Sequence, residues 1–242
     1  YLRIGDCYIV EKDYPQAVKY YKQALEIGQS DNDYGYYQLG LAYGLMRDDE
    51  KQVEAFKQLV AEYPSSPLVV GARFQLGNTL MDQGRYDEAL TEFEEIVNNY
   101  SGNTYVRKAL LQKGLIQYRQ EKYEDALSTF KMVVEQFPTL DDSKEAIARI
   151  EDIYVELGKI EEYNTWVADL NFYDVSTTRL DSITYAAAET KYVNGNCDGA
   201  IGAFQSYLEK YGGGIFALNA NFYMAECLFE KHLRPFYRYP RF

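Results

Sequence analysis

Apolar residues recur along the chain at three- and four-residue steps, the spacing that places side chains on one face of an α-helix. Leu76 and Leu80 follow this spacing in one segment, and Ala89 and Phe93 follow it in the next. Gly84 lies at the short break between the two segments, where a glycine can adopt a positive φ and end a helix. No segment shows the alternation of apolar and polar residues that is typical of a β-strand. The pattern therefore predicts pairs of amphipathic helices joined by short turns.

The paired-helix pattern repeats at a nearly constant offset. We use one position in the middle of each first helix as the marker position, and it is occupied by Gly5, Gly40, Gly77, Gly114, Glu151, Ala188 and Ala225. The first gap is 35 residues and each later gap is 37. A period between about 20 and 50 residues is typical of stacked-repeat proteins. We predict one all-α solenoid, an α-α superhelix over residues 1–242, with about six helix-turn-helix repeats and a partial seventh.

The repeat boundaries follow from the same offset. The predicted repeats cover residues 1–31, 33–66, 70–103, 107–140, 144–177 and 181–214, and the partial seventh covers 218–230. The fit is weakest in the fifth repeat, where Tyr163 replaces the small residue of the second helix and is expected to separate the two helices. Residues 231–242 have four basic and no acidic side chains, so they are either an unusual capping segment or sequence from outside the array.

The spacing of the small marker residue, tyrosine, alanine, phenylalanine and terminal proline resembles the tetratricopeptide repeat. The clearest copies are Gly77, Tyr86, Ala89 and Phe93, and then Gly114, Tyr123, Ala126, Phe130 and Pro138. This resemblance implies helix pairs that stack into a right-handed superhelix, with a concave groove lined mainly by the first helices.

Three extra residues in each repeat, such as Pro67-Leu68-Val69, make the period longer than the 34 residues usual in this family. Together with Tyr63-Pro64-Ser65-Ser66, they resemble a bacterial envelope subgroup. That subgroup includes the periplasmic coordinator associated with the Tol–Pal system and the lipoprotein of the outer-membrane β-barrel assembly machine. The resemblance implies a periplasmic or outer-membrane-associated location, with the cytoplasm as the alternative. Because Tyr1 already lies inside a predicted helix, we expect the chain to be a segment of a longer protein.

The groove positions can be counted from the marker: three residues before it, one after it and four after it. The candidate partner-binding residues are Tyr37, Leu41, Phe74, Asn78, Met81, Leu115, Tyr118, Tyr185, Tyr192 and Phe222. Large side chains in a groove can anchor a helix or an extended peptide of a partner. The alternative for each aromatic residue is packing between neighbouring repeats.

Composition and charge exclude several classes of function. The formal net charge is −12, which disfavours nucleic acid as a partner because phosphate binding needs clustered Lys and Arg. No run of about 18 apolar residues occurs, so no membrane-spanning segment is predicted. The 25 tyrosines suit both helix packing and a recognition surface.

Candidate catalytic and metal-binding chemistry is sparse. His232 is the single histidine and has no nearby Cys or Ser partner. Cys7, Cys197 and Cys227 are odd in number and far apart, so we predict small buried apolar residues rather than a disulfide framework or a zinc site. We predict no catalytic residue, no cofactor and no metal.

The pattern thus favours a non-enzymatic scaffold that binds a protein or peptide in its groove, as part of a larger bacterial cell-envelope protein. One alternative is a carbohydrate-binding module that stacks sugars on groove aromatics. Another is a helical accessory region of an envelope enzyme. The sequence predicts neither the identity of the partner nor the oligomeric state.

Overall fold

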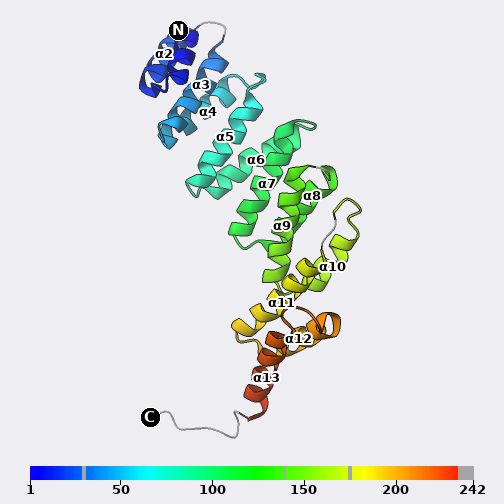
Figure 1. Cartoon of the computed structure of the whole chain (residues 1–242). Coiled ribbons are helices and arrows are strands. Elements are labelled where there is room, and N and C mark those ends of the chain that lie inside the picture. Colours follow the sequence, from blue (N-terminus) through cyan, green and yellow to red (C-terminus); the bar gives the residue numbers. More distant parts are fainter. Residues whose placement is uncertain (29–30, 139, 174–175, 234–242) are drawn as a thin grey trace, which may run out of the picture. The chain divides into compact units, whose positions relative to one another are not determined.

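The chain is described from a computed structural model that covers residues 1–28, 31–138, 140–173 and 176–233. These residues form thirteen α-helices and contain no strand (Figure 1). In chain order the helices are α1 (Leu2–Val10), α2 (Tyr14–Ile27), α3 (Asn32–Leu45), α4 (Asp49–Glu62), α5 (Val69–Asp82), α6 (Tyr86–Asn99), α7 (Thr104–Arg119), α8 (Tyr123–Gln136), α9 (Asp141–Glu156), α10 (Ile160–Ala168), α11 (Thr177–Val193), α12 (Cys197–Tyr211) and α13 (Ala217–Leu233).

The helices fall into two compact units. Unit 1 is Tyr1–Val133 and unit 2 is Val134–Phe242. Successive helices pack against one another from α1 to α7 in unit 1 and from α9 to α13 in unit 2. The predicted all-α solenoid of helix-turn-helix repeats is confirmed, with six helix pairs followed by α13. The organisation of residues 1–242 as one domain stays a prediction.

The turn inside each helix pair has the same backbone conformation in all six repeats. The residue seven positions after the marker has a positive φ, between 59° and 74°, and these residues are Lys12, Arg47, Gly84, Glu121, Gly158 and Gly195. Because an L-residue with a side chain is strained in this region, glycine is favoured there but is not required. The helix-ending role predicted for Gly84 is confirmed.

The core of each regular repeat lies between the marker glycine and an aromatic ring of the second helix. A Cβ atom placed on Gly77 would lie 2.7 Å from Cε1 of Phe93, and one placed on Gly40 would lie 2.6 Å from Cε1 of Phe56. The same contact joins Gly114 to Phe130 at 2.6 Å and Gly5 to Tyr21 at 2.5 Å. The four rings are fully buried. The small marker residue therefore allows the first helix to approach the ring of the second.

The fifth repeat replaces this apolar contact with a polar one. Glu151 occupies the marker position and is buried, and its carboxylate accepts a hydrogen bond from the Tyr163 hydroxyl at 3.1 Å. Arg179 of α11 donates a second hydrogen bond to the same carboxylate. The Tyr163 ring is fully buried, so it fills the space beside the marker, and its helix α10 has only nine residues.

The prediction that the cysteines are small buried apolar residues outside any disulfide is wrong for all three: Cys197 and Cys227 form a disulfide, and Cys7 is exposed. Cys197, the first residue of α12, forms a disulfide with Cys227 of α13, and their Cα atoms are 5.1 Å apart. Cys7 is exposed and free. Because α12 and α13 pack side by side, two cysteines 30 residues apart in sequence become neighbours. Cys227 is buried, as predicted.

The atypical C-terminal segment continues the last helix for a short distance. Residues 231–233 belong to α13, whereas 234–242 lie outside the described residues. The predicted end of regular structure near residue 230 is therefore too early by about one helical turn.

Candidate partner-binding groove

The proposed groove positions lie beside the buried marker on each first helix. An α-helix turns by about 100° per residue, so positions three before, one after and four after the marker fall within about 100° of it on one side. The marker faces the second helix of its own repeat. Its neighbours on this side are therefore half-buried at the edge of the repeat core.

The structure places the ten predicted residues in three classes. Tyr185 is buried and Phe222 is 61% exposed. The remaining eight are half-buried: Tyr37, Leu41, Phe74, Asn78, Met81, Leu115, Tyr118 and Tyr192. Unit 1 holds seven of these eight, on α3, α5 and α7, so the half-buried candidates are concentrated in that unit. Whether they bind a partner stays a prediction.

Three first helices of unit 1 meet at Gly71 of α5. A Cβ atom placed on Gly71 would lie 3.2 Å from the Tyr37 hydroxyl of α3 and 3.4 Å from the Tyr105 hydroxyl of α7. The ring centroids of Phe74 and Tyr105 are 5.2 Å apart. Burial, together with the nearby Tyr105 hydroxyl, raises the pKa of Tyr37. The absence of a side chain at Gly71 thus lets tyrosines from two neighbouring helices approach the helix between them.

Sequence reasoning missed Gly71 and Tyr105 because neither lies at a groove position counted from the marker. A glycine in the interior of a predicted helix was the available signal, because it often marks a close approach of another group.

Two predicted residues of unit 2 bond to acidic side chains. The Tyr185 hydroxyl donates to Glu189 at 2.8 Å, and its ring stacks on Phe216 with centroids 4.5 Å apart. Because Tyr185 is buried, it belongs to the core of the sixth repeat. The Tyr192 hydroxyl donates to Glu226 of α13 at 2.7 Å, and this hydrogen bond is the main reason that the pKa of Tyr192 is raised to about 12.

A small cavity of about 280 Å³ adjoins Tyr192 and the disulfide between Cys197 and Cys227. The acidic residues Glu226 and Glu230 also line it. The side of unit 2 that carries Tyr192 therefore combines an aromatic ring, carboxylates and a disulfide.

The described residues contain no group of three or more His, Cys, Asp or Glu arranged to hold a metal ion. The ten proposed groove side chains are apolar, aromatic or carboxamide groups.

None of the described helices combines the length and the hydropathy that a bilayer span requires.

Sequence models of the tetratricopeptide repeat match residues 1–30, 34–66 and 70–139, which together are more than half of the chain. The sequence matches no curated protein. In solved structures, the fold is similar to that of MamA, with 17% identity, a TM-score of 0.57, and coverage of 81% of this chain and 99% of that one.

Two other solved structures show the same fold. The structure described under the functional characterisation of Pseudomonas aeruginosa PilF shares 16% identity, covers 93% of this chain and 96% of that one, and has a TM-score of 0.55. A tetratricopeptide repeat protein from Parabacteroides merdae shares 16% identity, covers 84% of this chain and 74% of that one, and has a TM-score of 0.52. Identities this low show a shared fold.

Proposed function

The chain belongs to the tetratricopeptide repeat family, and from this premise we propose that it is a non-enzymatic scaffold that binds a peptide or helix of a partner protein in the groove of its first helices. Proteins of this family are generally protein-interaction scaffolds without catalytic activity. We further propose that the scaffold is part of a larger bacterial cell-envelope protein.

The observation that carries the proposal is a row of half-buried side chains on consecutive first helices of unit 1. Leu41 of α3 and Leu115 of α7 occupy the same repeat position, and Met81 of α5 lies one helical turn from its marker. Half-buried apolar side chains still have surface to bury against a partner, and a hydrophobic groove of this kind can accept the apolar face of a helix. The positions recur in each repeat, so an extended partner could contact several of them at once.

The disulfide supports the proposed envelope location. Disulfides persist in oxidising compartments such as the bacterial periplasm and are rare in the cytosol. The bond between Cys197 and Cys227 agrees with the periplasmic subgroup that the repeat sequence resembles. If the protein is isolated from its host under conditions that block thiols, we expect one free cysteine, Cys7. Three free cysteines would place the protein in a reducing compartment.

The carbohydrate-binding alternative needs aromatic faces that are free to stack on sugar rings. The ring of Phe74 packs against Phe93 and Tyr105, with centroids 5.9 and 5.2 Å away, and Tyr37 packs against Phe56 at 5.9 Å. These contacts favour a surface that accepts side chains of a protein. A glycan array with polysaccharide and peptidoglycan fragments tests the alternative directly.

The groove is tested by comparing two double variants in capture from a bacterial envelope extract. Leu41→Ala with Met81→Ala removes half-buried groove side chains from α3 and α5. The control, Gln58→Ala with Asn98→Ala, removes exposed side chains from α4 and α6. We expect the groove variant to lose a partner that the control and the native chain retain. Circular dichroism checks that both variants fold, and equal capture by all three proteins would contradict the groove assignment.

A further inference from the structure

A glutamine recurs on three consecutive first helices of unit 1, at a position outside the ten predicted groove residues. Gln38 of α3, Gln75 of α5 and Gln112 of α7 each lie two residues before the marker. At about 100° per residue, this position is about 160° from the marker, so it faces away from the second helix of its own repeat and lies beside the groove positions. All three glutamines are half-buried. The groove of unit 1 therefore carries a carboxamide group on each of these first helices.

Two carboxamide oxygens of this groove are buried without a partner. They are Oδ1 of Asn78 on α5 and Oε1 of Gln112 on α7, and neither accepts a hydrogen bond from any described residue. A buried acceptor without a donor destabilises a fold, and native proteins pair nearly all such atoms. The buried amide of Gln52 in the same unit is paired, because it accepts a hydrogen bond from the Thr79 hydroxyl at 3.1 Å. Asn78 and Gln112 thus lack an N–H or O–H donor that a bound chain could supply.

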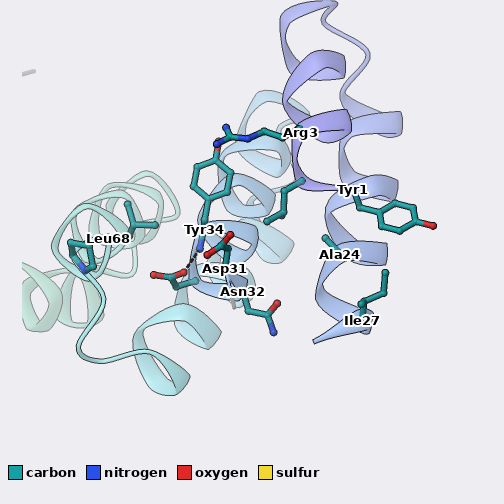
Figure 2. A pocket seen from close by; sticks show the side chains of 11 residues that line it. Tyr1, Arg3, Ala24, Ile27, Asp31, Asn32, Tyr34 and Leu68 are labelled. Carbon is teal, nitrogen blue, oxygen red and sulfur yellow. Dashed lines mark hydrogen bonds between the residues drawn. The ribbon is translucent and has the colours of Figure 1, made fainter. Parts of the chain in front are cut away.

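The amides of α5 and α7 carry more of this site than the amide of α3. The Gln38 amide interacts with the Tyr34 hydroxyl, and the centre of the Tyr34 ring lies 5.9 Å from Cζ of Arg3 (Figure 2). Gln38 is therefore already engaged within its own helix. In contrast, α5 and α7 pack directly against each other, since a Cβ atom placed on Gly71 would lie 3.4 Å from the Tyr105 hydroxyl. The site therefore rests on these two packed helices.

The spacing of the two helices favours an extended chain as the occupant. The axes of packed helices are about 8 to 10 Å apart, so Gln75 and Gln112, at the same position on α5 and α7, present their amides at about this interval. A polyproline II segment has three residues per turn and a rise of about 3.1 Å, or about 9 Å per turn, and its peptide groups make no internal hydrogen bonds. Every third peptide group of such a segment can therefore meet one of the amides. An α-helix bonds its own N–H and C=O groups and has none to offer along its side.

We propose that the groove of unit 1 binds its partner as an extended, polyproline II-like segment whose backbone is hydrogen-bonded by the amides of Gln75, Asn78 and Gln112. The proposal rests on the proposed partner-binding groove and specifies the conformation of its occupant. Peptide N–H groups donate to Oδ1 of Asn78 and Oε1 of Gln112, which turn toward the segment about their side-chain bonds. The Gln75 amide donates to a peptide carbonyl. Apolar side chains of the segment cover the half-buried Met81 and Leu115.

Three peptides test the proposed occupant on the full chain labelled with ¹⁵N. The extended probe is acetyl-Ala-Leu-Pro-Ala-Leu-Pro-Ala-Leu-Pro-Ala-amide, in which each proline holds itself and the preceding residue near the polyproline II conformation. In the ester probe, lactate replaces each alanine that follows a proline, which exchanges a backbone N–H for an oxygen. In the helical probe, α-aminoisobutyrate replaces each proline. The side-chain NH₂ signals of Gln75, Asn78 and Gln112 report contact with the amides directly.

We expect saturable shifts of these NH₂ signals with the extended probe, and binding about three- to tenfold weaker with the ester probe, as for loss of one hydrogen bond. The helical probe should also bind more weakly than the extended probe, because its N–H groups are bonded internally. Equal binding of the extended and ester probes would overturn the proposal. So would tighter binding of the helical probe, or no saturable change of the three signals up to about 10 mM.

Methionine in place of glutamine removes the amide and keeps the length of the side chain. Gln112→Met is expected to weaken the extended probe by about three- to tenfold and to reduce the difference between the extended and ester probes. It should also raise the midpoint of thermal unfolding, because a buried acceptor without a partner is removed. Gln75→Met should weaken the probe as well, and the control Gln58→Met, exposed on α4, should leave the affinity unchanged. Native affinity in both Gln75→Met and Gln112→Met would overturn the assignment, since a purely structural role predicts that binding is unchanged.

The groove and this assignment can fail separately. Loss of envelope capture by the double variant of Leu41 and Met81, with native probe affinity in both methionine variants, would keep the groove and reject the amide contacts. Equal capture by that double variant and the native chain, with weaker probe binding by Gln112→Met, would reject the groove as the site of the captured partner and support the amide contacts.

Discussion

Glycine recurs at the marker position in four repeats because an aromatic ring occupies the space where a side chain would lie. In four repeats, a Cβ atom on the marker would lie 2.5 to 2.7 Å from an aromatic carbon of the second helix. Real Cβ atoms do not approach carbon so closely, so the helix or the ring must move. The cost of adding a single methyl group is therefore set by how far a fully buried ring can shift.

Substitution Gly77→Ala is expected to destabilise the protein by about 1 to 3 kcal/mol, because the new methyl group clashes with the buried Phe93 ring. Urea unfolding followed by circular dichroism measures this change. Combining it with Phe93→Leu should cost less than the sum of the two single changes, since a smaller side chain leaves room for the methyl group. Strict additivity would show that the clash is relieved elsewhere.

A second pair of glycines separates backbone strain from steric contact. A Cβ atom would meet nothing within 4 Å at either Gly84 or Gly202, but Gly84 has φ = +74° and Gly202 lies inside α12. We expect Gly84→Ala to destabilise by about 1 kcal/mol and Gly202→Ala to stabilise by about 0.5 to 1 kcal/mol. Thermal unfolding of each variant measures whether its stability falls or rises. A loss of stability in both variants would mean that side-chain contacts, rather than φ, decide the outcome.

Among the elements, α10 differs most from its counterparts. It has nine residues, whereas α2, α4, α6 and α8 each have 14. Its repeat is also the one in which a carboxylate replaces the small marker. The buried Glu151 is bonded by Tyr163 within the repeat and by Arg179 of the next first helix, so part of the contact that other repeats make through rings is made here through hydrogen bonds.

Replacing Glu151 by glycine, the marker residue of the first four repeats, is expected to destabilise unit 2 by about 1 to 3 kcal/mol. The substitution leaves the buried Tyr163 hydroxyl without its acceptor and opens a cavity that no ring fills. Ala188→Gly, the matched change in the sixth repeat, should cost only about 0.5 to 1 kcal/mol, because it removes one methyl group from a helix. Denaturant unfolding compares the two, and a stabilised Glu151→Gly protein would show that the family pattern outweighs the polar contact.

The helix pairs could be predicted from the sequence because the marker, the turn residue and the aromatic residue recur with a fixed spacing. The disulfide could not, since Cys197 and Cys227 belong to different repeats and form no short motif. For the groove, the sequence predicts which positions line it but not how exposed each side chain is. Tyr37 and Tyr185 occupy the same place relative to their markers, yet Tyr37 is half-buried and Tyr185 is buried under Phe216. Exposure at one position depends on side chains of the following repeat, which the spacing does not specify.

The whole molecule divides into two units whose covalent constraints differ. The disulfide lies in unit 2 and joins the start of α12 to α13, and the free Cys7 lies in unit 1. Closing a loop of about 30 residues reduces the entropy of the unfolded chain, which corresponds to about 3 to 4 kcal/mol of stability in the loop-entropy model. The stabilisation by the disulfide is lost when the bond is reduced, and it acts on unit 2 only.

Reduction by a dithiol is therefore expected to lower the stability of unit 2 and leave unit 1 unchanged. Hydrogen exchange read out peptide by peptide should show faster exchange in α12 and α13 after reduction, with no change in α3 to α6. The variant Cys7→Ser controls for effects of thiol reagents on the free cysteine and should exchange like the native chain. Equal acceleration in both units would contradict a stabilising role confined to unit 2.

The polar contact in the fifth repeat also disfavours one kind of misfolding, the packing of helices from different repeats in the wrong order. A row of similar helix pairs can in principle assemble out of order, because α3 or α5 could pack against the ring of a different repeat as well as against its own. Glu151 removes this freedom for α9, since its carboxylate placed against a phenylalanine ring would be buried without a partner, at a cost of several kcal/mol. Tyr163 and Arg179 supply the partners that Glu151 needs, and we expect this polar contact to disfavour packing of α9 against the second helix of another repeat in unit 2.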